Sequence, residues 1–284
     1  MPGTCSRCGA RLPFLRRLSG SSLCASCEAT EGMEVESARQ QYAALLAQLS
    51  ASSIEPAQVQ AQLPELAKRA RLQGEELKRL HAESFKSYFD QALKDDRLTE
   101  DADKLLSEIG RVLGISQTTF DAQFNYLKPP LIVARANDGR LGVLANPQVM
   151  LKKGEVAHLQ ASATLLKEVV DRESGGTYGG VSFRVAKGVR VHTGAVGGKS
   201  IVVGTHLESA DIGLLTVTSQ RTIFAGQRQS IEMPHAKLLT LNVFWDGIRF
   251  HLSNRTKAPR FILTPGWGSA VAAVVNAAWQ RQSD

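Results

Sequence analysis

The chain contains no cysteine after residue 27, although it is 284 residues long. It also lacks any run of apolar residues long enough to cross a bilayer. Its first 23 residues carry four arginines and no long apolar stretch, so we expect neither a secretory signal peptide nor a membrane anchor there. These absences together predict a cytoplasmic protein without a transmembrane segment, in a compartment where disulfides rarely form.

Patterns typical of common catalytic sites are missing as well. The six histidines are scattered without the H-E-x-x-H spacing of zinc proteases, and the G-x-S-x-G elbow of serine hydrolases does not occur. Residues 194–200 resemble the end of a phosphate loop, but Thr193 stands where that motif requires glycine, and a strand-like run follows. A hairpin tip explains this segment better, and we expect a protein that is not an enzyme.

The cysteines that are present form two Cys-x-x-Cys pairs, Cys5 with Cys8 and Cys24 with Cys27. Such a pair directs two sulfurs at one ion, and the spacing of the two pairs is typical of zinc ribbons and knuckles. Gly9 suits the tight turn after the first pair, because glycine tolerates a positive φ angle. Two disulfides or a redox-active pair are the alternatives. We predict one structural Zn²⁺ per chain, held by four thiolates and therefore without an open catalytic position.

The overall composition is that of an ordinary soluble protein, with 43% hydrophobic and 21% charged residues. The net charge of +7 is unevenly distributed along the chain. Residues 1–32 carry +2, residues 33–128 carry −3 and residues 129–284 carry +8. A basic C-terminal half favours anionic partners, which include lipid headgroups, nucleic acids and acidic protein surfaces.

Four segments follow from the pattern of residues: a zinc-binding ribbon or knuckle at 1–32, a helical bundle at 33–128, a linker at 129–150 and a β domain at 151–284. The expected fold class is therefore α+β with several domains.

Within the helical segment, apolar residues recur at helical spacing over residues 33–50 and 75–94. Thr99 is placed to cap a further helix, because its side chain can accept a hydrogen bond from the first turn. Pro64 suits the first turn of a new helix. We expect residues 129–130, which are both proline, to end the bundle, since proline cannot continue a helix.

From about residue 156 the pattern changes to short β-rich runs separated by Gly, Asn, Asp or Pro. Turn residues at 225–227 and 245–247 indicate hairpins. Residues 266–280 then predict a helix whose apolar face includes Val271 and Val275. We expect an antiparallel β barrel whose open end is covered by this C-terminal helix.

Three motifs in the C-terminal half resemble bacterial PH-like, GRAM-related domains. They are Leu-Leu-Thr-Val-Thr-Ser-Gln-Arg-Thr-Ile-Phe-Ala-Gly from Leu214, Ser-Ile-Glu-Met-Pro from Ser230 and Asp-Gly-Ile-Arg-Phe from Asp246. The family usually has Asn-Lys-Arg where this chain has Ser-Gln-Arg, so only the arginine, Arg221, is shared. The resemblance covers residues 150–282, and its motifs concern turns and packing rather than catalysis.

A shorter resemblance connects the helical segment with TerB-like domains. It rests on Phe-Asp-Gln-Ala-Leu-Lys-Asp-Asp-Arg-Leu-Thr, which starts at Phe89, and on Gly-Ile-Ser, which starts at Gly114. It implies a helical bundle and carries over no site residue.

Basic residues at expected turns are the candidate binding residues of the β domain: Lys187, Arg190, Lys199, Arg255, Lys257 and Arg260. The PH-like resemblance implies that such loops can bind anionic lipid headgroups, while a charged, solvated loop tip is the simpler interpretation. Between the cysteine pairs, Arg16 and Arg17 could contact phosphates. The neighbouring Phe14 and Leu15 are more apolar than a nucleic-acid surface and suggest docking or packing.

These observations predict a non-enzymatic interaction or adaptor protein, with a protein as its partner. The alternatives are a protein that binds anionic lipid at a membrane surface and a zinc-dependent nucleic-acid-binding protein.

Overall fold

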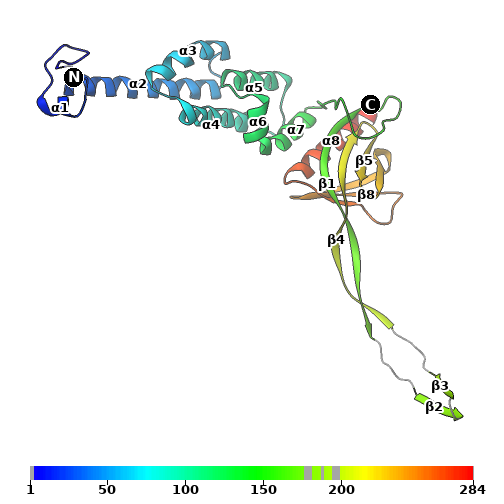
Figure 1. Ribbon diagram of the computed structural model, residues 1–284. Helices are drawn as coiled ribbons and strands as arrows, with labels where there is room; N and C mark the ends of the chain where they lie inside the picture. Colours follow the sequence, from blue (N-terminus) through cyan, green and yellow to red (C-terminus); the bar gives the residue numbers. More distant parts are fainter. Residues whose placement is uncertain (1–2, 176–180, 187–188, 194–198, 284) are drawn as a thin grey trace. The chain divides into compact units, whose positions relative to one another are not determined.

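The computed structural model describes residues 3–175, 181–186, 189–193 and 199–283. The chain divides into two compact units, Met1–Asp138 and Gly139–Asp284. The first unit is helical and contains the four cysteines, and the second contains the strands (Figure 1). The fold class is therefore α+β, as predicted. None of the helices in the described part of the chain is both long and apolar enough to cross a membrane.

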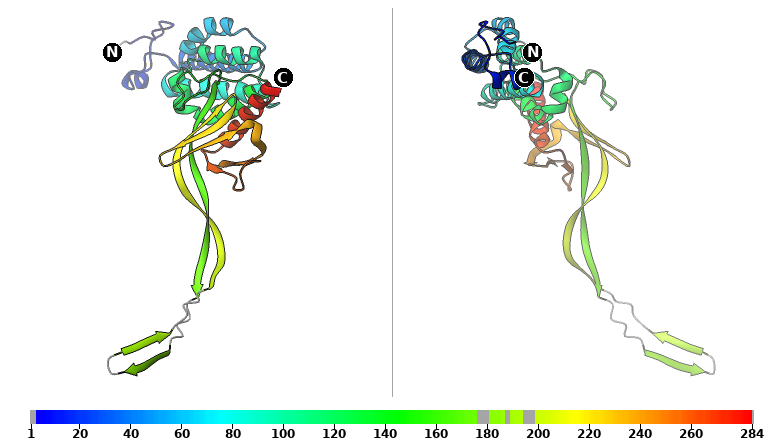
Figure 2. Two further views of the ribbon diagram at one scale, coloured as in Figure 1. Left: turned by 90° about the vertical axis from the view of Figure 1, so that its right-hand side faces the viewer. Right: turned by 60° about the vertical axis from the view of Figure 1, so that its left-hand side comes forward.

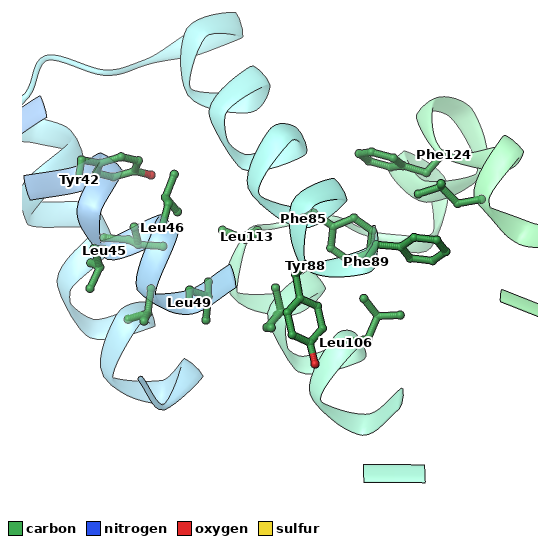
Figure 3. Close-up of a cluster of buried hydrophobic side chains, with 14 of the residues drawn as sticks. Tyr42, Leu45, Leu46, Leu49, Phe85, Tyr88, Phe89, Leu106, Leu113 and Phe124 are labelled. Atoms are coloured by element: carbon green, nitrogen blue, oxygen red, sulfur yellow. The ribbon is translucent and has the colours of Figure 1, made fainter. Parts of the chain in front are cut away.

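The first unit is made of short and medium helices: α1 (Phe14–Leu18), α2 (Ala25–Ser50), α3 (Pro56–Arg69), α4 (Gly74–Ala92), α5 (Glu100–Val112), α6 (Gln117–Gln123), the 3₁₀ helix η1 (Asn125–Leu127) and α7 (Lys128–Asn137). The apolar faces of α2 to α7 form one hydrophobic core, part of which is shown in Figure 3. Aromatic rings lie at its centre, where Phe85 packs against Phe120 and Phe124 with centroid distances of 6.2 and 5.4 Å.

The sequence signals at both ends of α5 are confirmed. The Thr99 side chain accepts a hydrogen bond from the backbone N–H of Ala102, which caps the start of α5. Gly114 has a φ of +69° and follows the end of α5 in the left-handed conformation that glycine adopts without strain.

Prolines behave differently from the prediction at two places. Pro64 lies inside α3 instead of starting a new helix. Lys128, Pro129 and Pro130 begin α7, which extends from the end of the expected bundle into the segment expected to be a linker. At the start of α7 the physical reason is that the N–H groups of a first helical turn have no intrahelical partner. Proline therefore loses no hydrogen bond there, and its fixed φ angle is already helical. The expected linker at 129–150 is thus wrong over the length of α7.

The second unit contains these elements: β1 (Ala157–Gly175), β2 (Val181–Ala186), β3 (Val189–Thr193), β4 (Lys199–Thr218), β5 (Arg221–Gly226), β6 (Ser230–Pro234), η2 (His235–Lys237), β7 (Leu238–Phe244), β8 (Gly247–Leu252), β9 (Arg260–Ile262) and α8 (Trp267–Ser283). Seven strands form one antiparallel sheet in the order β6-β5-β4-β1-β9-β8-β7, and β2 pairs with β3 in a separate sheet.

Two strands are much longer than the sequence pattern suggested. β1 and β4 pair with each other from Ala157 to Gly175, whereas β9 pairs with β1 only at Thr164–Leu166. The two strands therefore continue as a two-stranded ribbon past the rest of the sheet, which both views of Figure 2 show. Their length could not be read from a local run of β-forming residues, because the ribbon is defined by pairing across the chain.

The C-terminal helix α8 packs against the sheet, as the sequence predicted, but the strand order ends at β6 and β7, so the expected barrel stays a prediction. Val271 and Val275 are fully buried, and Val274 is 3% exposed. The helix contacts the edge strand β7 and its neighbour β8, and also the central strands β1 and β4. Burial of this face stabilises the domain through the hydrophobic effect.

Candidate metal centre and cationic cavity

The first cysteine pair lies in a tight turn. The backbone N–H of Cys5 donates to the carbonyl of Ala10 at 2.7 Å, and the N–H of Gly9 donates to the carbonyl of Cys5 at 2.9 Å. Gly9 has a φ of +73°, which confirms the sequence argument for glycine at this position. An isolated antiparallel bridge between Thr4 and Arg11 closes the turn.

The second pair lies at the start of a helix. Cys24 is the N-cap residue of α2, and Cys27 belongs to its first turn. The N–H of Ser6 donates to the carbonyl of Ser22 at 2.9 Å, which holds the first turn beside the start of α2. The hydroxyl of Ser26 and the backbone N–H of Cys27 lower the pKa of Cys24, so the thiolate is favoured at this N-cap position, where the amino end of the helix also carries partial positive charge.

The four sulfurs lie within 4.8 Å of one another, and the Sγ atoms of Cys8 and Cys24 are 3.7 Å apart. A regular tetrahedron with Zn–S bonds of about 2.3 Å requires sulfurs about 3.8 Å apart. All four cysteines are free, so the disulfide alternative finds no support here. The set Cys5, Cys8, Cys24 and Cys27 can therefore hold a metal ion.

Proton affinities within this cluster differ strongly from one sulfur to the next. Backbone N–H groups of Cys8, Cys24 and Arg7 lower the pKa of Cys5 to about 6. Hydrogen bonding to the sulfurs of Cys24 and Cys8 raises the pKa of Cys27 to about 12. Four sulfurs this close cannot all carry negative charge unless a cation lies between them, and a metal ion bound there would supply that cation.

Ion pairs join residues 3–24, called the cysteine module below, to α2. Arg7 pairs with Glu34, and Arg16 pairs with Glu28. Arg16 is thus engaged within the module rather than free for a phosphate. Leu12 is 1% exposed and packs inside the module, whereas Phe14 and the other apolar residues of α1 remain exposed.

The second site is an open cavity of about 630 Å³ on the sheet of the second unit. It is lined from β1, β4, β6, β8, β9 and the loop between β8 and β9, and six of its side chains are basic: Lys167, Arg249, His251, Arg255, Lys257 and Arg260. Glu168 is the acidic residue among its lining side chains. Lys167 also pairs with Glu208 at 3.5 Å. The cavity is therefore cationic overall.

Three nitrogens of this cavity are buried without a hydrogen-bond partner among the described residues: Nε of Arg249, Nε2 of His251 and Nε of Arg260. The strand register explains why two of them are neighbours, since Arg249 of β8 lies opposite Arg260 of β9. The guanidinium of Arg260 also lies over the ring of Phe244, 5.0 Å from its centroid. A buried polar nitrogen without a partner is unfavourable, so these groups indicate a place for an anionic acceptor.

No family model and no curated protein matches the chain. The sites must therefore be interpreted from their own geometry.

The cavity contains part of the predicted binding set. Arg255, Lys257 and Arg260 all line it. Arg190 lies on β3 in the separate two-stranded sheet, and Lys199 begins β4, but their side chains are outside the described residues. Lys187 lies outside the described residues altogether.

Sequence reasoning missed Lys167, Arg249 and His251. A signal was present, because Arg249 and His251 alternate along β8 with the buried residues Ile248, Phe250 and Leu252. Alternation of this kind places both basic side chains on one face of the sheet. Arg260 joins them only through the pairing of β8 with β9.

Proposed function

We propose that the protein is a non-enzymatic interaction protein with a structural zinc site and a PH-like domain that binds an anionic group. The observation that carries the binding function is the set of three buried, unpartnered nitrogens in the cationic cavity. The seven-stranded antiparallel sheet with its C-terminal helix supports the PH-like assignment.

Zinc is the metal that fits the cysteine set best, because four sulfur ligands in a tetrahedral arrangement are typical of structural zinc. Its role is to hold the cysteine module against the start of α2. Elemental analysis of the purified protein should give one zinc per chain. Substoichiometric metal together with two disulfides by mass spectrometry would contradict this assignment.

The anionic group is a carboxylate or a phosphate, since both offer several acceptor oxygens to converging guanidinium groups. An acidic segment of a protein partner and a lipid headgroup are the two sources of such a group. Fluorescence anisotropy with an oligoglutamate peptide and sedimentation with phosphatidylserine vesicles distinguish them. Binding should weaken as salt rises, because partly exposed charges are screened.

Arg249→Gln tests the cavity, because this residue loses its charge but keeps a polar side chain. We expect binding of the peptide or the vesicles to weaken about tenfold or more. Lys153→Gln is the matched control, since Lys153 is exposed, lies in the same unit and does not line the cavity. Equal loss in both variants would mean that general charge rather than the cavity binds. Binding to neither probe would remove this function.

A further inference from the structure

The strand β7 is an edge of the seven-stranded sheet and pairs only with β8 among the described residues. The opposite edge strand, β6, carries devices that discourage pairing: it is short, ends at Pro234 and contains the charged Glu232. β7 has the sequence Leu-Leu-Thr-Leu-Asn-Val-Phe, without proline or charge. Its one irregularity is a register shift between Leu238 and Thr240, and from Thr240 to Phe244 its pairing with β8 is regular. Such an open apolar edge favours pairing with another strand.

The faces of β7 follow from its register with β8. Leu241 lies opposite Phe250, and Val243 lies opposite Ile248, and both partners are buried in the core. Leu241 and Val243 are therefore on the core face of the strand. Leu239 lies at a register shift between Leu238 and Thr240 and lines the same groove beside α8 as Leu241 and Val243 do. Even so, Leu239 is 70% exposed and Val243 is 43% exposed. Their exposure means that α8 does not cover this margin of the core.

An open groove of about 460 Å³ lies between β7 and α8. On the helix side it is lined by Ala272, Ala273, Val275, Asn276 and Trp279. Trp279 is 49% exposed, and Trp245 just beyond β7 is 74% exposed. Exposed apolar side chains that gather in this way mark an interaction surface on a soluble protein.

We propose that β7 pairs with β7 of a second copy of this chain, antiparallel and centred on Leu241, to form a twofold-symmetric dimer. In this register Leu241 lies opposite its own copy, and Leu239 lies opposite Val243 of the second copy on the core face. On the other face Thr240 lies opposite Asn242 of the second copy. Apolar residues thus meet apolar residues and polar residues meet polar ones along the strand.

Charges at the ends of β7 suit the same arrangement. Lys237 precedes the strand, Asp246 follows it, and both are exposed. Antiparallel pairing of the two β7 strands brings Lys237, at the end of η2, near Asp246 at the other end of β7 in the second copy. A parallel arrangement would place like charges together. In the twofold-symmetric pair each β7 edge is hydrogen-bonded to the other, so neither is free to add a further strand. The assembly therefore closes as a dimer instead of extending into a fibre.

Sedimentation equilibrium of the full chain over a range of protein concentrations tests this interface. We expect a monomer–dimer equilibrium that Leu239→Glu shifts to monomer, with a dissociation constant raised about a hundredfold, because two carboxylates would be buried in the symmetric contact. Leu239 is mostly exposed in the single chain, so a thermal melt should show that the variant still folds. Glu65→Gln, which changes an exposed side chain in the first unit, is the control and should leave the equilibrium unchanged.

A charge exchange gives an independent test that does not touch the core face. Lys237→Asp alone should weaken the dimer about tenfold, since the symmetric interface contains the pair twice. Lys237→Asp combined with Asp246→Lys should restore the original dissociation constant. A monomer at every concentration would overturn the proposal. So would a dimer that neither Leu239→Glu nor the charge reversal at Lys237 affects.

Discussion

Arg221 and Glu155 form a buried ion pair in the second unit, Gly139–Asp284, which is called the sheet domain below. Nε of Arg221 donates to Oε1 of Glu155 at 2.9 Å, and the two side chains are 7% and 0% exposed. Burial raises the pKa of Glu155, but hydrogen bonds from Arg221, from the N–H of Lys152 and from the Thr218 hydroxyl outweigh it and hold this pKa below its ordinary value. Arg221 is the residue that the chain shares with the Asn-Lys-Arg motif of PH-like domains, and here its role is structural.

Arg221→Met should lower the free energy of unfolding of the sheet domain by about 3–5 kcal/mol, because it leaves the Glu155 carboxylate buried and unpaired. Urea denaturation followed by tryptophan fluorescence measures this, since all three tryptophans lie in the second unit. Glu232→Gln, which removes the 54% exposed second partner of Arg221, should change the same free energy by less than about 1 kcal/mol. Equal effects of the two variants would contradict this distinction.

His235 is buried in the same domain, and it gives the stability a dependence on pH. Its side chain is near Thr222, with Nε2 3.1 Å from the threonine hydroxyl. Burial lowers the pKa of His235 from 6.5 to about 4. The unfolded chain therefore binds a proton at His235 at a pH where the folded protein does not. The contribution of neutral His235 to the free energy of unfolding is complete above pH 6.5 and is lost as the pH falls toward 4.

Between pH 7 and pH 4 the expected loss from His235 is about 3 kcal/mol. Tryptophan-detected urea denaturation at a series of pH values should show this decline, and His235→Gln should flatten it above pH 5. Glutamine keeps a polar group for Thr222 but does not titrate. An unchanged pH profile in the variant would assign the decline to other groups.

The contact between α8 and the sheet depends on close approach of two backbones. A Cβ atom added at Gly268 would lie 2.5 Å from the carbonyl oxygen of Gly247 and 3.2 Å from that of Phe244. Both partners are backbone atoms, so neither can move aside without displacing β7 or β8. Gly268 thus lets the first turn of α8 lie directly on the hairpin of these strands.

Gly268→Ala should destabilise the sheet domain by about 2 kcal/mol, because overpacking forces the helix away from the sheet. Ser269→Ala is the control, since Ser269 is the next residue and is exposed. Thermal unfolding followed by tryptophan fluorescence compares the two variants. Equal unfolding midpoints of the two variants would mean that α8 shifts to accommodate the added methyl group without loss of stability.

The two compact units predict different responses to metal removal. The four sulfurs and all of α2 belong to the first unit, and the tryptophans belong to the second. Because the free energy of metal binding is local folding energy, a chelator should unfold the cysteine module and the first turns of α2. Circular dichroism should show a small loss of helix, while the tryptophan-detected midpoint stays unchanged. Cys24→Ser should reproduce the loss without chelator, and a shifted tryptophan transition would contradict the expected independence.

Some features of this protein were accessible from short stretches of sequence. The spacing of the cysteines predicted their grouping, because each Cys-x-x-Cys turn is a local structure and only two turns must meet. The cap at Thr99 follows from its side-chain oxygen at the start of a helix. The buried face of α8 at Val271 and Val275 follows from helical periodicity, and both signals are equally local. The PH-like assignment and the bound zinc stay predictions.

Other features depend on which segments pair across the chain. Arg249 and Arg260 become neighbours only because β8 lies beside β9, and β7 becomes an exposed edge only because the sheet order ends there. A strand pattern shows which residues share a face but not which strand lies next to it. The sequence alone therefore determined the cysteine cluster, the ends of α5, the buried face of α8 and the β-rich half. Tertiary packing decided the cavity and the free edge, since both are made by contacts between residues far apart in the chain.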